Sequence, residues 1–387
     1  MKKQKICIIG GSLAALTTAI SLSKLKCDID LITGPKDIDL KSSRTLALSE
    51  SNLNYLKQLG VLGTSDKIFW PCSAMKLYTG NRNNEFSKIF EINNDLKKEK
   101  ILYMFENKKI LKKLMEKIKK IKIISVKNNE KVSEIENFGL LKNVKFNKIK
   151  YKYNLIIICS GNNSNLVKKF FKNKFIENSY KETSITTILN HSSNKNNVAR
   201  QIFLDNEILA FLPLSNSKTS VVWSVKKNIL KKNDLLLKKK IKSYANKYFK
   251  KITFKSQLEF KNLNFLIRSQ YYQDRILLFG DALHVVHPFA GQGFNMVLRD
   301  LSSLEKVLKN RIKLGMDIGS PDVLLEFSQK AKPANLIYSL GIDLLKSFFS
   351  YNSQPVKKTR NKIIQQIDKS EIIKNLFFNF ANQGLKF

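Results

Sequence analysis

The sequence predicts an α/β fold in which a Rossmann-like domain carries an inserted β-rich domain and ends in C-terminal helices. A βαβ pattern opens the chain, with a buried-strand pattern at 5–9, a small-residue turn at 10–15 and an apolar helix pattern at 16–25. Far along the chain, a second apolar run at 275–279 leads into a Gly-Asp turn at 280–281. Buried strands that end in such turns are typical of α/β folds that receive an anionic cofactor.

The first turn is a reduced form of the Gly-x-Gly-x-x-Gly phosphate-binding pattern. It retains Gly10 and Gly11, while Ser12 and Ala15 replace the second and third glycines of the pattern. Gly10 is expected to make the tight turn. Ser12 and Ala15 are small enough to allow close approach of a ligand and close packing of the helix. Taken alone the pattern is weak, because many α/β folds could carry it.

The second strand, predicted at 28–32, lacks the acidic residue that would hold a ribose at its end. Thr33 stands in that place. A threonine hydroxyl can still bond a ribose hydroxyl, although without the charge-assisted strength of a carboxylate.

The most specific pattern is the run GDALHVVHPFAGQGFN at 280–295. Gly280 allows a ligand to approach the backbone, and Asp281 can accept hydrogen bonds from sugar-type hydroxyls. The helix predicted at 295–309 offers free N–H groups and a partial positive charge at its start. The alternative is a plain turn capped by Asp281, which would not require so many specified positions.

This run resembles the second FAD-binding motif of the class A flavoprotein monooxygenases, the para-hydroxybenzoate hydroxylase-like enzymes, and most of all the ring hydroxylases of ubiquinone biosynthesis. The resemblance implies a Rossmann-like FAD-binding domain of the GR2 type, with Asp281 on the ribityl chain and the following loop against the isoalloxazine ring. Val297 departs from the family, which usually has glycine there. The cofactor-binding positions implied are Gly280, Asp281, Pro288, Gly291, Gln292, Gly293, Phe294 and Asn295.

Further stretches extend the resemblance over nearly the whole chain. Arg44, within 43–48, would inherit a flavin-proximal or pyrophosphate role, and the alternative is a solvated loop arginine. The segment 102–107 resembles a family segment that is followed directly by a long helix. In the segment 155–164, Ser160 replaces an aspartate that the family links to both FAD and NADPH. This departure bears on the nicotinamide step more than on FAD binding.

The resemblance also implies the activity. NADH or NADPH would reduce FAD, O₂ would add to the reduced ring, and a flavin hydroperoxide would hydroxylate the aromatic ring of a polyprenylated phenol in ubiquinone biosynthesis. Such a substrate suits a pocket with few polar groups and many Phe and Leu side chains. His287 and Pro288 are the candidate catalytic residues. The alternative is that His284 and His287 only order the loop.

Two other functions stay open. One is a different FAD enzyme on the same scaffold, such as a prenyl reductase, a halogenase or another aromatic hydroxylase. The other is a catalytically weak flavoprotein subunit of a biosynthetic complex, which the substitutions at Ser12, Ala15, Thr33 and Ser160 motivate.

The domains are expected to be discontinuous. The FAD-binding domain would be built from 1–70, 97–178 and 266–330, and the substrate-binding β-sheet domain from 71–96 and 179–265. Residues 331–387 read as C-terminal helices. One is predicted from Ala334 to Phe349 after a break at Pro333, and another from Ser370 to Asn382.

Composition agrees with two packed domains. The chain has 387 residues, of which 43% are hydrophobic and 25 are Phe, enough for a sizeable core. Its four cysteines are scattered and its three histidines lack ligand spacing, so no metal site is expected. A reducing cytoplasm fits these cysteines best. The first apolar run reads as a strand and phosphate turn rather than a signal peptide.

The net charge of +38 comes almost entirely from lysines spread over every segment, with eight arginines in the chain. Proteins that read nucleic acids concentrate Arg and Lys on one face, so no nucleic-acid partner is expected. Attraction to anionic surfaces remains at this charge. The resemblance implies O₂ and a polyprenyl-phenol as partners. Together with the charge and the cysteines, it leads us to expect a cytoplasmic protein with a place at the inner face of the membrane or in a quinone-biosynthesis complex.

Overall fold

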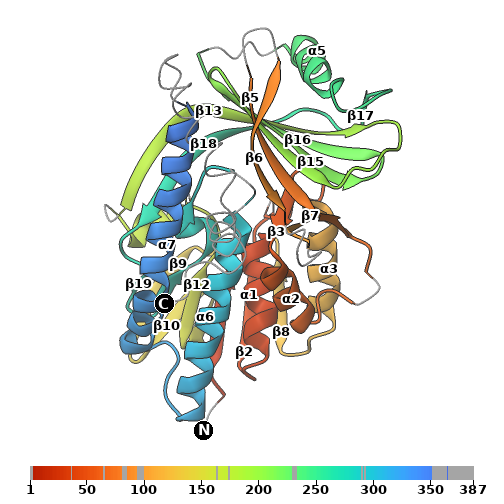
Figure 1. Cartoon of the computed structure of the whole chain (residues 1–387). Coiled ribbons are helices and arrows are strands. Elements are labelled where there is room, and N and C mark those ends of the chain that lie inside the picture. The colour runs from red at the N-terminus through yellow and green to blue at the C-terminus, as the bar shows by residue number, and fades with distance from the viewer. Residues whose placement is uncertain are drawn as a thin grey trace.

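The computed structural model describes all residues except 1–2, 36, 64–65, 81–84, 94–99, 163, 173–174, 229–232, 289–290, 292, 351–363 and 365–387. Two large sheets dominate the described part, one in each half of the molecule (Figure 1). A long C-terminal helix runs along both halves.

The first sheet carries the predicted dinucleotide pattern. Its six strands lie in the order β19 (Tyr272–Gln273), β20 (Ile276–Leu278), β12 (Leu155–Ile158), β1 (Lys5–Ile9), β2 (Asp28–Thr33) and β8 (Ile124–Asn128). All neighbours are parallel except β19 and β20. The near-continuous apolar runs of β1, β12 and β20 are buried, as expected for strands covered on both faces.

Helices cover this sheet in the front of Figure 1: α1 (Leu13–Ser23), α2 (Glu50–Gln58), α3 (Asn107–Lys119) and α6 (Gly293–Lys313). A short helix, α4 (Asn165–Phe170), follows β12. A three-stranded sheet of β9 (Glu134–Phe138), β10 (Leu141–Phe146) and β11 (Ile149–Tyr153) contacts β1 and β12. The domain is therefore layered around the parallel sheet.

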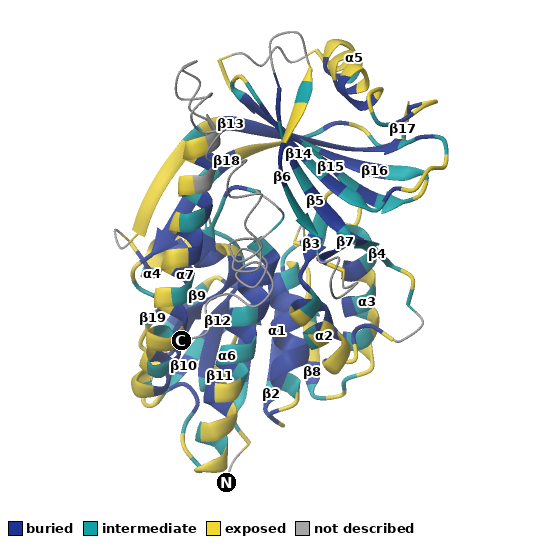
Figure 2. Ribbon diagram, viewed as in Figure 1, coloured by how far each residue is buried: buried dark blue, intermediate teal, exposed yellow. Residues whose placement is uncertain are grey.

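The second large sheet has nine strands and covers the first domain. They are β21 (His284–Val285), β18 (Glu259–Arg268), β13 (Phe175–Asn190), β16 (Lys218–Lys226), β15 (Glu207–Ser215), β14 (Val198–Leu204), β5 (Ala74–Gly80) and β6 (Phe86–Asn93), with β17 (Thr253–Phe254) beside β13. Helix α5 (Asp234–Ala245) packs on its outer face and is exposed on the far side (Figure 2). The sheet extends several residues beyond both ends of the predicted range 179–265, since β13 begins at Phe175 and β18 ends at Arg268.

A small sheet joins the two halves. Strand β7 (Leu102–Glu106) lies between β3 (Thr45–Leu48) and β4 (Phe69–Cys72). Strand β21, which belongs to the Gly-Asp segment, pairs with β18 of the large sheet. The predicted cofactor loop is thereby tied directly to the predicted substrate domain.

The predicted helix break at Pro333 is wrong. A single helix, α7 (Pro321–Ser350), runs through this proline. An interior proline costs about 3 kcal/mol through a lost hydrogen bond and a steric clash. Buried side chains on both sides of it, Phe327 and Ala331 before and Tyr338 and Ile342 after, hold the helix against the body of the protein. Tertiary packing thus outweighs the local penalty. The helix predicted at 370–382 lies outside the described residues.

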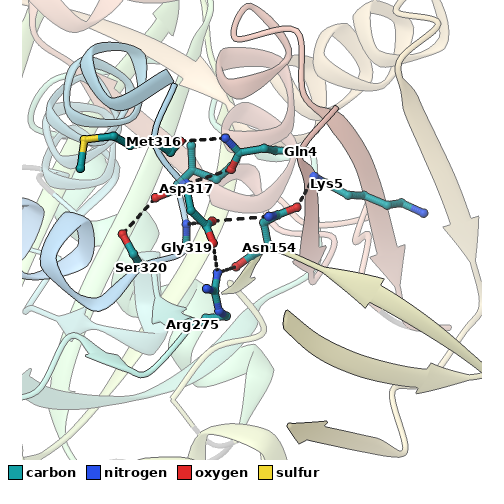
Figure 3. Close-up of polar contacts among 9 residues, drawn as sticks. Gln4, Lys5, Asn154, Arg275, Met316, Asp317, Gly319 and Ser320 are labelled. Carbon is teal, nitrogen blue, oxygen red and sulfur yellow. Dashed lines mark hydrogen bonds and ion pairs between the residues drawn. The ribbon is translucent and has the colours of Figure 1, made fainter. Parts of the chain in front are cut away.

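The turn between α6 and α7 is fastened to the amino ends of the parallel strands (Figure 3). Arg275, just before β20, donates from Nη1 to the Asn154 carbonyl at 3.0 Å and pairs with Asp317 at 2.7 Å. Gln4 donates to the Met316 carbonyl at 2.8 Å and accepts from the backbone of Ile318 at 2.9 Å. This network lies at the sheet edge opposite the Gly-Asp turn.

We expect Gly319→Ala to destabilise the fold strongly. A Cβ on Gly319 would lie 1.7 Å from the Asn154 carbonyl oxygen, which is backbone and cannot move aside cheaply. Overpacking of this kind costs about 1–3 kcal/mol, so thermal unfolding should show a clear fall in Tm. The control is Gly341→Ala in α7, where a Cβ would meet no atom of the described residues within 4 Å. There the better helix propensity of Ala should raise stability by about 1 kcal/mol. An unchanged Tm in Gly319→Ala would contradict the packing described here.

Candidate functional site

The carboxyl ends of neighbouring parallel strands bring the predicted motifs together. Gly10 follows β1, Ser160 comes shortly after β12, and Gly280 comes shortly after β20. These three strands are neighbours in the order β20-β12-β1. A Cβ on Gly10, whose φ is +129°, would lie 3.0 Å from the Cys159 carbonyl. A Cβ on Gly280, at φ +65°, would lie 2.7 Å from the Ala14 Cβ. Only glycine fits at both turns. Because their strands are neighbours, the two predicted motifs meet at the carboxyl ends of the strands, where open α/β sheets bind ligands.

The start of helix α1 lies at this edge. Ser12 is its N-cap, accepting from the Ala15 amide at 3.4 Å and donating to the Cys159 carbonyl at 3.4 Å. Ala15 is fully buried against the core, as its predicted packing role requires. Gly11 has Asp37 and Ile38 so close that a Cβ would meet both at 2.8 Å. The free amides and dipole of the helix start are suited to an anionic group such as a pyrophosphate.

Asp281 is exposed at the start of the short 3₁₀ turn η1 (Gly280–Ala282). Within the described part of the chain its carboxylate forms no hydrogen bond or ion pair. Nearby segments add buried hydroxyls that also lack a described partner: Ser160 Oγ after β12, and Ser43 Oγ and Thr45 Oγ1 beside Arg44. Buried polar groups are normally hydrogen-bonded. The open carboxylate and these unsatisfied hydroxyls therefore fit a polar cofactor such as FAD.

Thr33 does not present a free hydroxyl. It lies at the end of β2 but is 2% exposed, and its Oγ1 donates to Asn128 Oδ1 at 3.1 Å. Thr33 lies at the end of β2 as predicted, yet β8 supplies a partner for the hydroxyl that no local pattern reveals. The geometry gives Thr33 a structural hydrogen bond within the sheet.

Arg44 lies on an exposed loop that the large sheet holds in place. Its Nε is 4.0 Å from Glu259 of β18. The same carboxylate accepts from Ser42 Oγ at 3.1 Å and from the backbone amide of Ser43. Because the arginine is half exposed, the ion pair is weak and leaves the guanidinium available to a ligand. Glu259 was not singled out from the sequence.

Gly291 and Asn295, beyond Pro288, lie against strand β3 and the residue that follows it. Gly291, at φ +67°, comes so close that a Cβ would lie 2.9 Å from the Ala47 Cβ. Asn295 donates to the Ala47 carbonyl at 2.8 Å and accepts from the Ser49 amide at 3.1 Å and from Asn52 Nδ2 at 2.8 Å. Its buried amide therefore positions the loop.

The remaining residues of this loop divide between core and surface. Gly293 begins α6, and a Cβ on it would meet no described atom within 4 Å. Phe294 is buried in the core, and Pro288 is half-buried. Gln292 lies outside the described residues.

The two histidines of the motif have different partners. His284 Nε2 is 2.9 Å from Asp300 Oδ2, and the same aspartate accepts from Asn335 Nδ2 at 2.8 Å. All three side chains are buried. Through Asp300 and Asn335, His284 connects the motif to α6 and α7 by hydrogen bonds.

His287 instead reaches the large sheet. Its Nε2 is 3.3 Å from Glu182 Oε2 of β13, and the other oxygen of Glu182 is 2.8 Å from Lys346 Nζ of α7. Burial lowers the pKa of His287, with Glu182 opposing the shift. Burial raises the pKa of Glu182, but hydrogen bonds from His287 and Lys346 outweigh it and hold that pKa below its usual range. His287 is therefore neutral at pH 7 and Glu182 is ionised.

Sequence reasoning missed Glu182 and Lys346 as site residues. Glu182 is 105 positions before His287, and Lys346 is one of many lysines. No local pattern marks them.

Among the described residues there is no cluster of His, Cys, Asp and Glu that could hold a metal ion. No helix in the described ranges is both long and apolar enough to cross a membrane.

Comparison with known proteins agrees with this geometry. The family model for the FAD binding domain matches residues 3–334. The ubiquinone biosynthesis monooxygenase COQ6 of Dictyostelium discoideum is 25% identical and aligns over 97% of this chain and 90% of its own length. The ubiquinone hydroxylase UbiL of Rhodospirillum rubrum is 28% identical over 54% of this chain, and the chain spans about half (49%) of that relative.

Among solved structures, p-nitrophenol 4-monooxygenase PnpA from Pseudomonas putida superposes with a TM-score of 0.81, over 100% of this chain and 99% of that one. At 15% identity this likeness concerns the fold alone. The family match covers most of the chain, including both turns that meet at the sheet edge. The chain belongs to the family of proteins built on this FAD-binding domain.

Proposed function

We propose that the protein is an FAD-dependent monooxygenase that hydroxylates the aromatic ring of a polyprenylated phenol in ubiquinone biosynthesis, using NADH or NADPH and O₂. The names of its relatives support this reading, since they include a ubiquinone hydroxylase and ubiquinone biosynthesis monooxygenases. The 3-demethoxyubiquinol 3-hydroxylase of Escherichia coli is 29% identical over 44% of the chain.

The observation that carries the proposal is an apolar cluster beside the cofactor edge. It joins the inner face of the large sheet to α6 and α7, through residues such as Leu77, Phe203, Met296 and Ile342, and Val286 of the motif packs against it. A phenol with a prenyl tail needs an environment of this kind, which also excludes water from the reaction.

The residues at the edge would divide the work. Asp281 and the start of α1 would hold the ribityl chain and the pyrophosphate of FAD, with Arg44 nearby. The chemistry that FAD supplies when bound is the activation of O₂ with electrons from the nicotinamide. His287, neutral and buried, would take the proton of the phenol, and Pro288 would shape the loop beside it.

Product analysis tests the proposal. The FAD-loaded protein is incubated with NADPH, ¹⁸O₂ and a short-chain prenylphenol, and we expect a product heavier by one ¹⁸O atom on the ring. The unprenylated phenol is the control and should react much more slowly. A product reduced in its prenyl chain would indicate a reductase instead. Bound flavin with no product would indicate a catalytically weak flavoprotein subunit, the alternative suggested by the serine at position 160.

We further propose that the protein associates peripherally with an anionic membrane surface. Helix α7 exposes Leu336, Ile337, Leu340 and Leu344 on one face, and the net charge is +38. Co-sedimentation with vesicles containing anionic lipid should exceed that with neutral vesicles, fall with salt, and weaken in Leu344→Ser. Equal recovery with both vesicle types would count against attachment.

A further inference from the structure

The cluster around His287 is built from three separate parts of the molecule. His287 comes from the cofactor loop, Glu182 and Tyr180 come from β13 of the large sheet, and Lys346 comes from α7. The Lys346 ammonium lies 4.6 Å from the centre of the Tyr180 ring, and this ring meets the His287 ring edge-on at 5.2 Å. Side chains of His287 and Glu182 are 2% and 6% exposed. A carboxylate is seldom buried to this degree unless it is paired, and Glu182 is paired with His287 and Lys346.

The hydrogen-bond pattern fixes which nitrogen of His287 carries its proton. An ionised carboxylate only accepts hydrogen bonds, so the Nε2 facing Glu182 must be the donor. The neutral ring then has its lone pair on Nδ1. This nitrogen is buried and has no hydrogen-bond partner among the described residues. A buried acceptor without a partner costs free energy, which is recovered when a ligand hydroxyl donates to it.

We propose that Glu182 and Lys346 are positioning residues that hold His287 in the Nε2-protonated form, so that Nδ1 is a lone-pair acceptor for the substrate hydroxyl. The inference rests on the proposed hydroxylase function in one respect, which is that the proton donor is a phenol. In the step itself, the phenol O–H bond breaks and its electron pair stays on the oxygen. The proton binds Nδ1, and the resulting imidazolium is paired with the Glu182 carboxylate.

Lys346 sets the strength of this base. Its charge offsets that of Glu182, so the carboxylate orients the ring without making it strongly basic. The groups that face His287 are Glu182 and Tyr180 from β13, and Lys346 and Asp343 from α7.

The test exploits the small number of histidines, which is three. Histidine is labelled with ¹⁵N in the FAD-loaded protein, and the His287 signals are assigned by their loss in His287→Gln. In the wild type at pH 8 we expect Nε2 protonated and Nδ1 bare. Glu182→Gln should lower the pKa of His287, because Lys346 remains, and should mix the two tautomers. Lys346→Met should raise the pKa, because Glu182 is left without its cation.

Opposite pKa shifts follow from the two charges alone, so the readout that a purely structural role would not move is the rate. The acid limb of the kcat/KM profile should follow the same two shifts. If a single variant fails to fold because it leaves an unpaired buried charge, the double variant E182Q/K346M removes both charges and should fold. Its His287 should show mixed tautomers. A proton on Nδ1 in the wild type, shifts in the same direction, or a single fixed tautomer in the double variant would overturn the inference.

The labelling experiment needs no substrate, so it separates this inference from the proposed function. If the tautomer is as expected but no prenylphenol is hydroxylated, the positioning role stands and the substrate assignment is lost. If hydroxylation occurs with Nδ1 protonated, the reverse holds.

Discussion

Asp281→Ala should lose FAD while keeping its fold. The carboxylate is exposed at the sheet edge and has no partner among the described residues, so its removal breaks nothing in the protein itself. A hydrogen bond to a charged group contributes about 1.5–3 kcal/mol. At 1.4 kcal/mol per factor of ten, the Kd for FAD should rise about 10- to 150-fold. Flavin fluorescence titration of the apoprotein measures this change.

The graded variant and the control sharpen the test. Asp281→Asn retains an acceptor oxygen without the charge and should show an intermediate loss. Asp234→Asn, in the first turn of α5 on the outer face of the large sheet, should bind FAD as the wild type does. The melting temperatures of the three variants, measured without FAD, should agree closely with that of the wild type. Equal affinity of Asp281→Ala and wild type would remove this residue from the cofactor site.

His287→Gln should abolish most of the hydroxylation without releasing the flavin. General base catalysis contributes about 10²- to 10⁴-fold, so kcat for ring hydroxylation should fall by that factor. FAD content should stay the same, since the side chain reaches towards Glu182 and the large sheet. The matched control is His191→Gln, a buried histidine on the β13–β14 connection, which should retain the hydroxylation rate of its folded fraction.

The pH dependence has a definite sign. Burial lowers the pKa of His287 from its ordinary value near 6.5. Protonation removes the lone pair from Nδ1, so kcat/KM should fall as the pH falls through this lowered pKa. The wild-type rate should therefore be flat near pH 7 and decline only at a pH below the ordinary histidine pKa. A profile without an acid limb, or an unchanged rate in His287→Gln, would show that the phenol loses its proton elsewhere.

The features that the sequence predicted well are those that local chemistry determines. Gly10 was expected at a tight turn and Gly280 where a ligand approaches the backbone, and at each of them a Cβ would collide with a neighbouring segment. Asp281 was expected to accept hydrogen bonds from sugar-type hydroxyls, and the residue is exposed. The apolar strands before these residues lie next to each other in the sheet, which explains how motifs separated by most of the chain meet.

The features that the sequence could not predict depend on partners from distant segments. The Thr33 hydroxyl bonds Asn128 of β8, and Glu182 and Lys346 converge on His287 from a strand and a helix far apart in the chain. Pro333 signals a helix break locally, yet packing on both sides keeps α7 continuous. In each case a tertiary contact decides what the side chain does.

The most direct test of FAD-dependent oxygenation is the visible spectrum of the purified protein, followed without oxygen after addition of NADPH and then with oxygen restored. We expect a flavin spectrum that bleaches with NADPH and returns when O₂ is admitted. Flavin that NADPH never bleaches, with or without a prenylphenol, would point to the serine at position 160. A protein that takes up no FAD, even after reconstitution, would contradict the proposed function outright.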